Sequence, residues 1–165
     1  VLCRGGGRRQ RCRSLLPFGV PPTHPALLEI HAYDGPGYRP LVDFQHWRVA
    51  VLNFGTELLP DHLTCMQPHN DTDEVFVLLQ GRCILFTGEG RDTLTRIHAE
   101  DLQPHRVYNV RQGVWHTHTL SQDAKVLVVE NQDTTWDNSP FTPLDEAQMG
   151  EIAHLTRALW ADAEG

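Results

Sequence analysis

The chain has 165 residues, enough for one domain with a sizeable core, and its 40% hydrophobic and 21% charged residues are ordinary for a globular protein. Its formal net charge of −7 argues against nucleic acid or an anionic membrane as a main partner. No apolar run approaches the roughly 20 residues of a membrane helix, so we predict no membrane-spanning segment.

The N-terminal residues differ from the rest in charge. Residues 1–13 carry five arginines and no acid, which leaves nine basic against 21 acidic residues for the remainder. The segment lacks the apolar stretch of a secretory signal, and its three successive glycines follow no strand, so no phosphate-binding loop is predicted. We expect a basic, proline-rich tail or arm over residues 1–26, which the acidic body could tether. The four cysteines show no CxxC spacing, which indicates a reduced, cytoplasmic setting.

Short β-strands are predicted to follow one another through the middle of the chain, with turn residues between them. The candidates are residues 27–33, 47–54, 75–79, 82–87, 93–99, 106–110, 114–120 and 124–130. Residues 82–87 are expected to pair back on residues 75–79 across Gly81 as a hairpin. Many short strands with turn signals every eight to twelve residues are typical of an all-β sandwich or barrel. Trp47, Trp115 and Trp136 are expected in its core.

One helix is predicted near the C-terminus. Thr142 is expected to cap it, Pro143 suits its first position, and Asp145 stands where a capping-box acid belongs. The residues that follow a helical spacing are Gln148, Ile152, Leu155 and Leu159. Their face is expected to pack on the outside of the barrel or on a second subunit. The predicted organisation is a tail over residues 1–26, a barrel over 27–137, and a helix with its tail over 138–165.

The stretch from Gln67 to Gly81 places polar side chains directly before an apolar strand. Gln67, His69 and Glu74 are all able to bind a metal. Asp71 and Asp73 are the better turn-capping residues, because short acids bond their own backbone. Glu74 is therefore free to point inward beside His69.

A second stretch, from Val107 to Leu120, offers further imidazoles. His116 and His118 share one face of the strand that follows the turn at Gly113, because side chains alternate along a strand. Two segments about forty residues apart therefore each place imidazole on a strand next to a turn. Two histidines and one carboxylate, with an amide or water added, suit Fe, Mn, Ni or Zn and leave positions open for substrate.

The first stretch resembles the first motif of the cupin family, which reads Gly, five residues, His-x-His, three or four residues, Glu, six residues, Gly. Here His69, Glu74 and Gly81 fit the second half of the motif. Gln67 stands in place of the first histidine, and Asp61 in place of the leading glycine.

The second stretch resembles the second cupin motif, which reads Pro-x-Gly, two residues, His, three residues, Asn. Gly113 and His116 fit, whereas Arg111 replaces the proline and Leu120 the asparagine. The resemblance covers roughly residues 41–131, and it implies a double-stranded β-helix barrel with the helix outside.

The resemblance also implies one divalent transition metal (Fe, Mn, Ni or Zn) held by His69, Glu74 and His116, with Gln67 as a weak fourth ligand through its amide oxygen. The expected function is binding or acting on a small polar metabolite, as an isomerase, lyase or dioxygenase. His118 or Tyr108 would then be the catalytic residue that moves the proton.

Two alternatives remain open from the sequence. One is a cupin that binds a metal or small molecule without turnover, because a small barrel offers the same cavity to both classes. The other is a metal-free structural role, motivated by Gln67. Because cupin relatives commonly pair, we also expect a homodimer, joined through apolar surface over residues 15–28 and 144–160.

Overall fold

The structure is a computed structural model that describes residues 23–161. The chain divides into two compact units, Val1–Ile30 and His31–Gly165, and every strand and helix named below lies in the second. The expected N-terminal tail lies largely outside the described residues. None of the helices in residues 23–161 combines the length and apolar character that a membrane span requires.

The prediction of a first strand over residues 27–33 is wrong. Residues 25–27 form a turn, and the chain then runs to Gly37 without strand pairing. The carbonyls of Tyr33 and Gly35 accept hydrogen bonds from the side-chain amide of Asn53, at 3.3 and 2.7 Å, so side-chain contacts replace a sheet ladder here. The true first strand, β1 (Gly37–Phe44), was missed.

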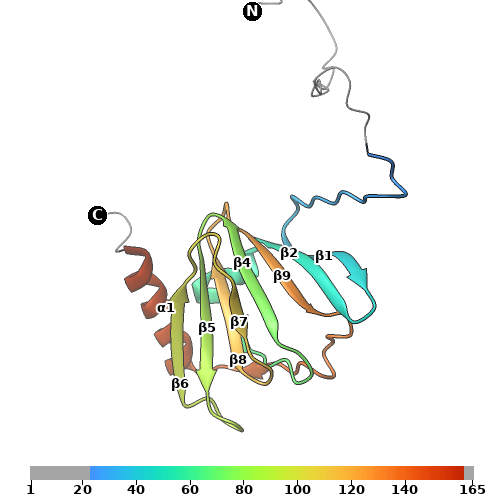
Figure 1. Ribbon diagram of the computed structural model, residues 1–165. Helices are drawn as coiled ribbons and strands as arrows, with labels where there is room; N and C mark the ends of the chain where they lie inside the picture. Colours follow the sequence, from blue (N-terminus) through green and yellow to red (C-terminus); the bar gives the residue numbers. More distant parts are fainter. Residues whose placement is uncertain (1–22, 162–165) are drawn as a thin grey trace, which may run out of the picture. The chain divides into compact units, whose positions relative to one another are not determined.

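Two antiparallel sheets make up the body of the fold (Figure 1). The larger sheet has the order β1, β2 (Trp47–Asn53), β9 (Lys125–Asn131), β4 (Glu74–Gln80) and β7 (Tyr108–Val110). The smaller sheet has the order β6 (Arg96–Asp101), β5 (Cys83–Glu89) and β8 (Trp115–Leu120). A short ribbon joins β10 (Thr142–Pro143) to β3 (Cys65–Met66), and the 3₁₀-helices η1 (Thr56–Leu58) and η2 (Pro60–His62) follow β2.

The main core fills the space between the two sheets. Phe76 and Leu78 of β4 and Val126 of β9 belong to the same buried cluster as Leu85 of β5 and Leu120 of β8. The expected alternation along β4 is observed, since every second side chain from Glu74 to Leu78 is buried. The inner face of each sheet is thus apolar, apart from the polar residues described below.

The predicted hairpin of residues 75–79 with 82–87 does not form. β4 pairs with β7 and β9, whereas β5 pairs with β6 and β8, so the chain crosses from one sheet to the other at Gly81. Gly81 has φ +70°, and a Cβ there would lie 2.6 Å from the Cα of Ala124. A glycine is therefore required at this crossing.

The helix α1 (Glu146–Ala161) packs on the outer face of the smaller sheet, beside β6 and β5 (Figure 1). Ile152 lies in a second buried cluster with Ile84 and Phe86 of β5 and Ile97 of β6. Both faces of β5 are therefore buried. Of the two expected positions for the helix, the outside of the barrel is the one observed.

The capping residue of the helix lies three residues later than predicted. Thr142 and Pro143 pair with β3 as strand β10, and Asp145 is the capping residue instead. The amide of Gln148 donates to Asp145 Oδ1 at 2.8 Å, and the amide of Asp145 donates to Gln148 Oε1 at 2.9 Å. This reciprocal pair is a capping box.

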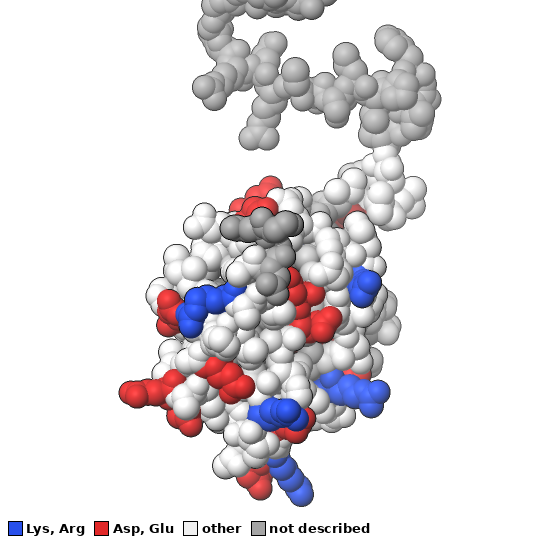
Figure 2. Space-filling view, turned by 90° about the vertical axis from the view of Figure 1, so that its left-hand side faces the viewer, with Lys and Arg blue, Asp and Glu red and all other residues white. Residues whose placement is uncertain are grey.

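Acidic and basic side chains are interspersed on the face of the molecule shown in Figure 2, rather than gathered by sign. The predicted all-β fold, a double-stranded β-helix of the jelly-roll kind with a C-terminal helix outside, is confirmed, with the strands arranged as separate sheets rather than one closed barrel.

Candidate metal centre

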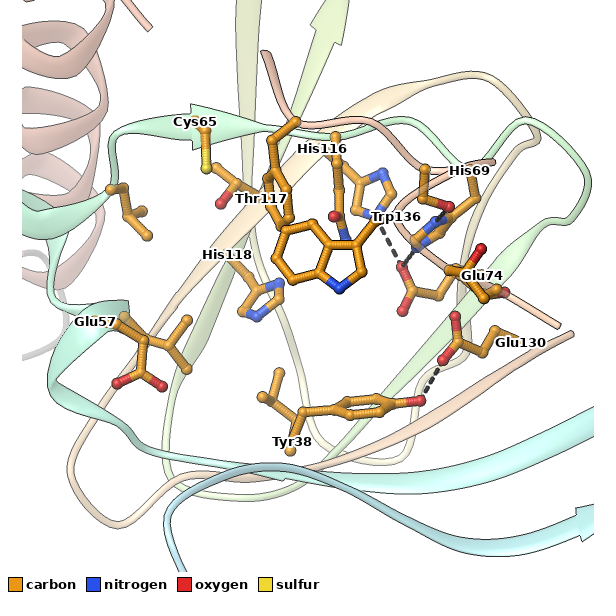
Figure 3. Close-up of a pocket in the computed structure, with 18 of the residues that line it drawn as sticks. Tyr38, Glu57, Cys65, His69, Glu74, His116, Thr117, His118, Glu130 and Trp136 are labelled. Carbon is orange, nitrogen blue, oxygen red and sulfur yellow. Dashed lines mark hydrogen bonds and ion pairs between the residues drawn. The ribbon is translucent and has the colours of Figure 1, made fainter. Parts of the chain in front are cut away.

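Three of the predicted metal ligands meet between the two sheets (Figure 3). Glu74 begins β4 of the larger sheet, His116 lies on β8 of the smaller sheet, and His69 follows β3. Glu74 Oε2 lies 2.9 Å from His69 Nε2 and 2.7 Å from His116 Nε2. One ligand atom from each of these buried residues lies within 4.8 Å of the other two, so the group can hold a metal ion.

Backbone hydrogen bonds hold the segments that carry these side chains next to each other. Gln67 and His116 exchange both backbone hydrogen bonds, at 3.1 and 3.0 Å, and Gly113 donates its amide to the carbonyl of His69 at 2.8 Å. Asp73 was expected to bond its own backbone, but its carboxylate instead accepts the amide of Gln112, in the second motif stretch, at 2.8 Å. The two motif stretches are therefore joined by hydrogen bonds on either side of the candidate centre.

The hydrogen bonds of His116 bear directly on whether a cation fits. The carbonyl of Val114 can only accept, so His116 Nδ1, at 2.9 Å from it, carries a hydrogen. Nε2 then faces the Glu74 carboxylate, which is also an acceptor. Without a cation, a proton must be shared between Nε2 and the carboxylate oxygen, whereas a bound divalent ion could accept a lone pair from each of them. The donor set fits a divalent ion.

His69 is held in a similar way, since its Nδ1 lies 2.6 Å from the hydroxyl of Ser139. Burial alone would raise the pKa of Glu74, but the hydrogen bonds from His116 and His69 lower it to about 2. Burial would lower the pKa of His69, but the hydrogen bond to Glu74 and its charge raise it above the ordinary value. The carboxylate is therefore ionised at neutral pH and attracts positive charge.

A cavity of about 530 Å³ opens onto the three candidate ligands. Gln67 lines it, and because it is paired directly with His116, its side chain lies on the same side of the sheet. His118 also lines it, two residues along β8 from His116. His118 Nδ1 has no hydrogen-bond partner among residues 23–161, and burial lowers the pKa of this imidazole to about 4.

Tyr108 is the one candidate that the structure does not bring to the cavity. Its ring packs against the main core, and its hydroxyl accepts the backbone amide of Gln103 at 2.8 Å. Val110, two residues after Tyr108 on β7, is paired with Glu74, whereas Tyr108 is paired with Phe76, two residues further along β4. The proposed proton-transfer role of Tyr108 is therefore corrected to a structural one.

Sequence reasoning missed three polar residues that line the cavity on the side of the larger sheet, the sheet that also carries Glu74. Tyr38 of β1 donates its hydroxyl to the carboxylate of Glu130 on β9, and Arg48 of β2 lies directly opposite Glu130 in the strand register. Burial raises the pKa of Glu130, although the Tyr38 hydrogen bond lowers it, and burial with the Glu130 carboxylate raises the pKa of Tyr38. Only one sequence feature points to Glu130 as a cavity residue: it is an acid at the end of an apolar strand, as Glu74 is an acid at the start of one.

Trp136 corrects another expectation. It lies on the loop between β9 and β10, lines the mouth of the cavity and is 75% exposed, rather than buried in the core. Its ring lies 4.7 Å from that of Phe141, which also lines the cavity. The spacing of residues in the sequence does not predict this position, because it depends on the path of the loop from β9 to β10.

No protein-family model matches the sequence, and no curated protein is similar enough to count as a match. Among solved structures, the chain matches a cupin-2 domain protein from Shewanella frigidimarina, with 19% identity over 65% of this chain and 87% of that one, and a TM-score of 0.40. It matches Fe(II) HppE with 18% identity over 56% of this chain and 48% of that one, and a TM-score of 0.46. It matches Streptomyces PAC13 with uridine, with 7% identity over 72% of this chain and 87% of that one, and a TM-score of 0.48.

These likenesses concern the fold alone. One of the three is itself a cupin-2 domain protein, in agreement with the resemblance noted in the sequence, and the activities of the three proteins are their own.

Proposed function

We propose, for a chain with a cupin-like fold, that His69, Glu74 and His116 bind one divalent transition metal and that this metal holds a small polar molecule in the cavity. The observation that carries the proposal is the convergence of two imidazoles and one carboxylate, all buried and drawn from both sheets. Buried polar groups need partners, and here a single cation would satisfy all three. Iron, manganese, nickel and zinc all accept this ligand set.

The remaining coordination positions would face the cavity. Gln67 is proposed as a weak fourth ligand through its amide oxygen, which is a poorer donor than imidazole to late transition metals. A metal bound here would polarise a carbonyl or hydroxyl oxygen of the ligand. The cavity is lined by apolar side chains together with many polar and charged ones, and its size suits a small polar metabolite rather than a polymer.

Two residues are placed to exchange protons with such a ligand. His118, on β8, lines the cavity, and its Nδ1 has no hydrogen-bond partner among the described residues. Glu130, on β9 of the other sheet, also lines the cavity. We propose that they act as general acid or base in an isomerase, lyase or dioxygenase type of reaction. Binding without turnover is the alternative, in which the same two residues would only hydrogen-bond the ligand.

We also propose a homodimer, in a cytoplasmic setting. The apolar face of α1 packs on its own sheet, so it is not free to pair as expected from the sequence. Phe44 and Trp47, whose rings lie 5.8 Å apart at the hairpin of β1 and β2, are exposed and offer apolar surface for an interface instead. Light scattering that reports a monomer at micromolar concentration would rule the dimer out.

The experiment that tests the metal site is metal analysis by mass spectrometry of purified wild type, His116→Ala and Glu74→Gln. Wild type is expected to carry close to one metal per chain, and both variants much less. His98 and Glu89 provide matched controls, because they form an exposed pair on β6 and β5, 2.7 Å apart and outside the cavity. His98→Ala and Glu89→Gln should keep the wild-type metal content.

Equal metal content in wild type and both site variants would show that the ion is held elsewhere. No metal in wild type after growth with Fe, Mn, Ni and Zn in excess would overturn the proposal outright.

A further inference from the structure

Two aromatic side chains stand at the mouth of the cavity with much of their surface uncovered. Trp136 is 75% exposed and Phe141 is 44% exposed, although both are large and apolar. Both line the cavity that holds the candidate metal centre, and Figure 3 shows the Trp136 indole among the cavity side chains. An indole that lines a ligand cavity and remains exposed has a flat face available for a ligand to cover.

The loop that carries Trp136 is fixed in place by hydrogen bonds. The side chain of Asn138 accepts the amide of Thr135 at 2.8 Å and donates to the carbonyl of Asp133 at 3.1 Å. The Asn138 carbonyl accepts the amide of Asn70 at 3.0 Å. The loop therefore has a defined conformation. The Asn138 side chain links its two ends, and a backbone hydrogen bond joins it to Asn70, which follows His69.

The same loop contacts the candidate metal centre directly. Ser139, three residues after Trp136, places its buried hydroxyl 2.6 Å from His69 Nδ1. One short segment thus sets both the orientation of a candidate metal ligand and the position of the indole. A site that is preorganised in this way can bind a ligand at two points at once, with the indole covering its flat face and the metal centre contacting its end.

We propose that the ligand of this cavity carries a planar, unsaturated ring that stacks on Trp136, with oxygen substituents directed at the metal. The inference rests on the proposed metal site and names the class of molecule that the site accepts. Other aromatic rings in the cavity wall, those of Tyr38 and His118, add to the preference for a flat ligand over a flexible aliphatic one. Glu130 and Arg48 also line the cavity and can bond the polar edge of the ring in addition to their contacts with Tyr38 and Asp43.

The test compares two metal-binding probes that differ in the ring. 4-Nitrocatechol presents two adjacent oxygens on an aromatic ring, whereas oxalate presents two oxygens without one. Binding of each to the zinc-loaded full chain is measured by calorimetry, for wild type and Trp136→Ala. We expect Trp136→Ala to weaken 4-nitrocatechol about tenfold or more, as stacking contacts of this kind usually do, and to leave oxalate unchanged.

Two further variants keep the test interpretable. Trp136→Phe retains a flat ring and should recover most of the lost affinity. Val107→Ala reduces another exposed apolar side chain, which lies just before β7 and does not line the cavity, and it should change neither probe. Because Trp136 is largely exposed, its replacement should leave the thermal unfolding midpoint close to wild type.

Each other outcome contradicts the inference in a recognisable way. Equal weakening of both probes would mean that Trp136 only shields the mouth from water, and no change in either would mean that the indole contacts no ligand. If neither probe binds the zinc-treated chain better than the metal-free chain, then the metal site itself has failed and the ring preference falls with it.

Discussion

Glu74 and His116 contact each other across the gap between the two sheets, with Oε2 and Nε2 separated by 2.7 Å. Both side chains are buried. Their strands, β4 and β8, belong to different sheets and do not pair with each other. This contact therefore joins the two sheets at the candidate metal centre.

Metal binding should release protons and strengthen as pH rises. In the metal-free protein, His116 and His69 direct protons at Glu74, and a metal must displace them. The apparent affinity for zinc should therefore be higher at pH 8 than at pH 6, with about one or two protons released per ion at the lower pH. Calorimetry in two buffers of different ionisation enthalpy measures that number directly. An affinity independent of pH would mean that the imidazoles are not ligands.

The stability of the metal-free protein should depend on pH through the same cluster. Glu74 has a pKa lowered from 4.5 to about 2, so its contribution is present above pH 4.5 and is lost as pH falls toward 2. His69 has a pKa raised above 6.5, so its contribution is present below 6.5 and is lost as pH rises through the raised value. The cluster should therefore stabilise the fold most between pH 4.5 and 6.5.

Urea unfolding of metal-free wild type and Glu74→Gln at pH 3, 5.5 and 8.5 tests this window. The difference in unfolding free energy should be greatest near pH 5.5, on the order of 3 kcal/mol from the size of the Glu74 shift. A difference that stayed constant across the three pH values would show that Glu74 stabilises the fold by packing rather than by charge.

Gln67→His should tighten metal binding. Gln67 lies opposite His116 in the backbone bridge and lines the cavity, so a histidine there would offer imidazole in place of an amide oxygen. Competition with a coloured chelator should show an affinity increase of about tenfold. Gln80→His, at the exposed end of β4, is the control and should bind as wild type does. An unchanged Gln67→His would mean that this side chain does not reach the ion.

Arg82→Ala should destabilise the attachment of the C-terminal helix. The Arg82 guanidinium donates to the carbonyls of Leu159 and Trp160 at 3.1 Å each and pairs with Asp101 at 2.6 Å. These bonds satisfy carbonyls in the last turn of α1, and the group is only partly exposed. We expect a loss of about 1–2 kcal/mol in chemical denaturation.

The control for this variant is Arg91→Ala, which removes an exposed arginine in the turn after β5. It should change the unfolding free energy by less than about 0.5 kcal/mol. Equal effects in the two variants would show that Arg82 acts only through the net charge of the protein.

The parts of the structure that could be predicted from sequence are those fixed by short-range spacing. His69 and Glu74 are five residues apart and flank one turn, and His116 and His118 share a face of one strand, so their placement follows from strand geometry. The apolar strands around residues 47–54, 75–79 and 124–130 were marked by their own composition and were found close to where they were expected.

What could not be predicted depends on partners far away in the sequence. β1 was not predicted, and it contains Pro40, which is tolerated because it lies on an edge strand beside a register shift, where a missing amide breaks no ladder. The Tyr38 and Glu130 pair joins residues 92 positions apart, which no spacing rule detects. The hairpin across Gly81 failed because the burial of both faces of β5, not local turn preference, decides the pairing.

The crossing at Gly81 also has a consequence for how the chain folds. Because β4 and β5 follow each other in sequence but enter different sheets, neither sheet can be completed by a contiguous piece of chain. β2 must wait for β9, more than seventy residues later, and the candidate ligands come together only when both sheets are in place. Folding dominated by such distant pairings is slow, on the millisecond-to-second scale, and metal that arrives early would meet scattered single ligands rather than a site.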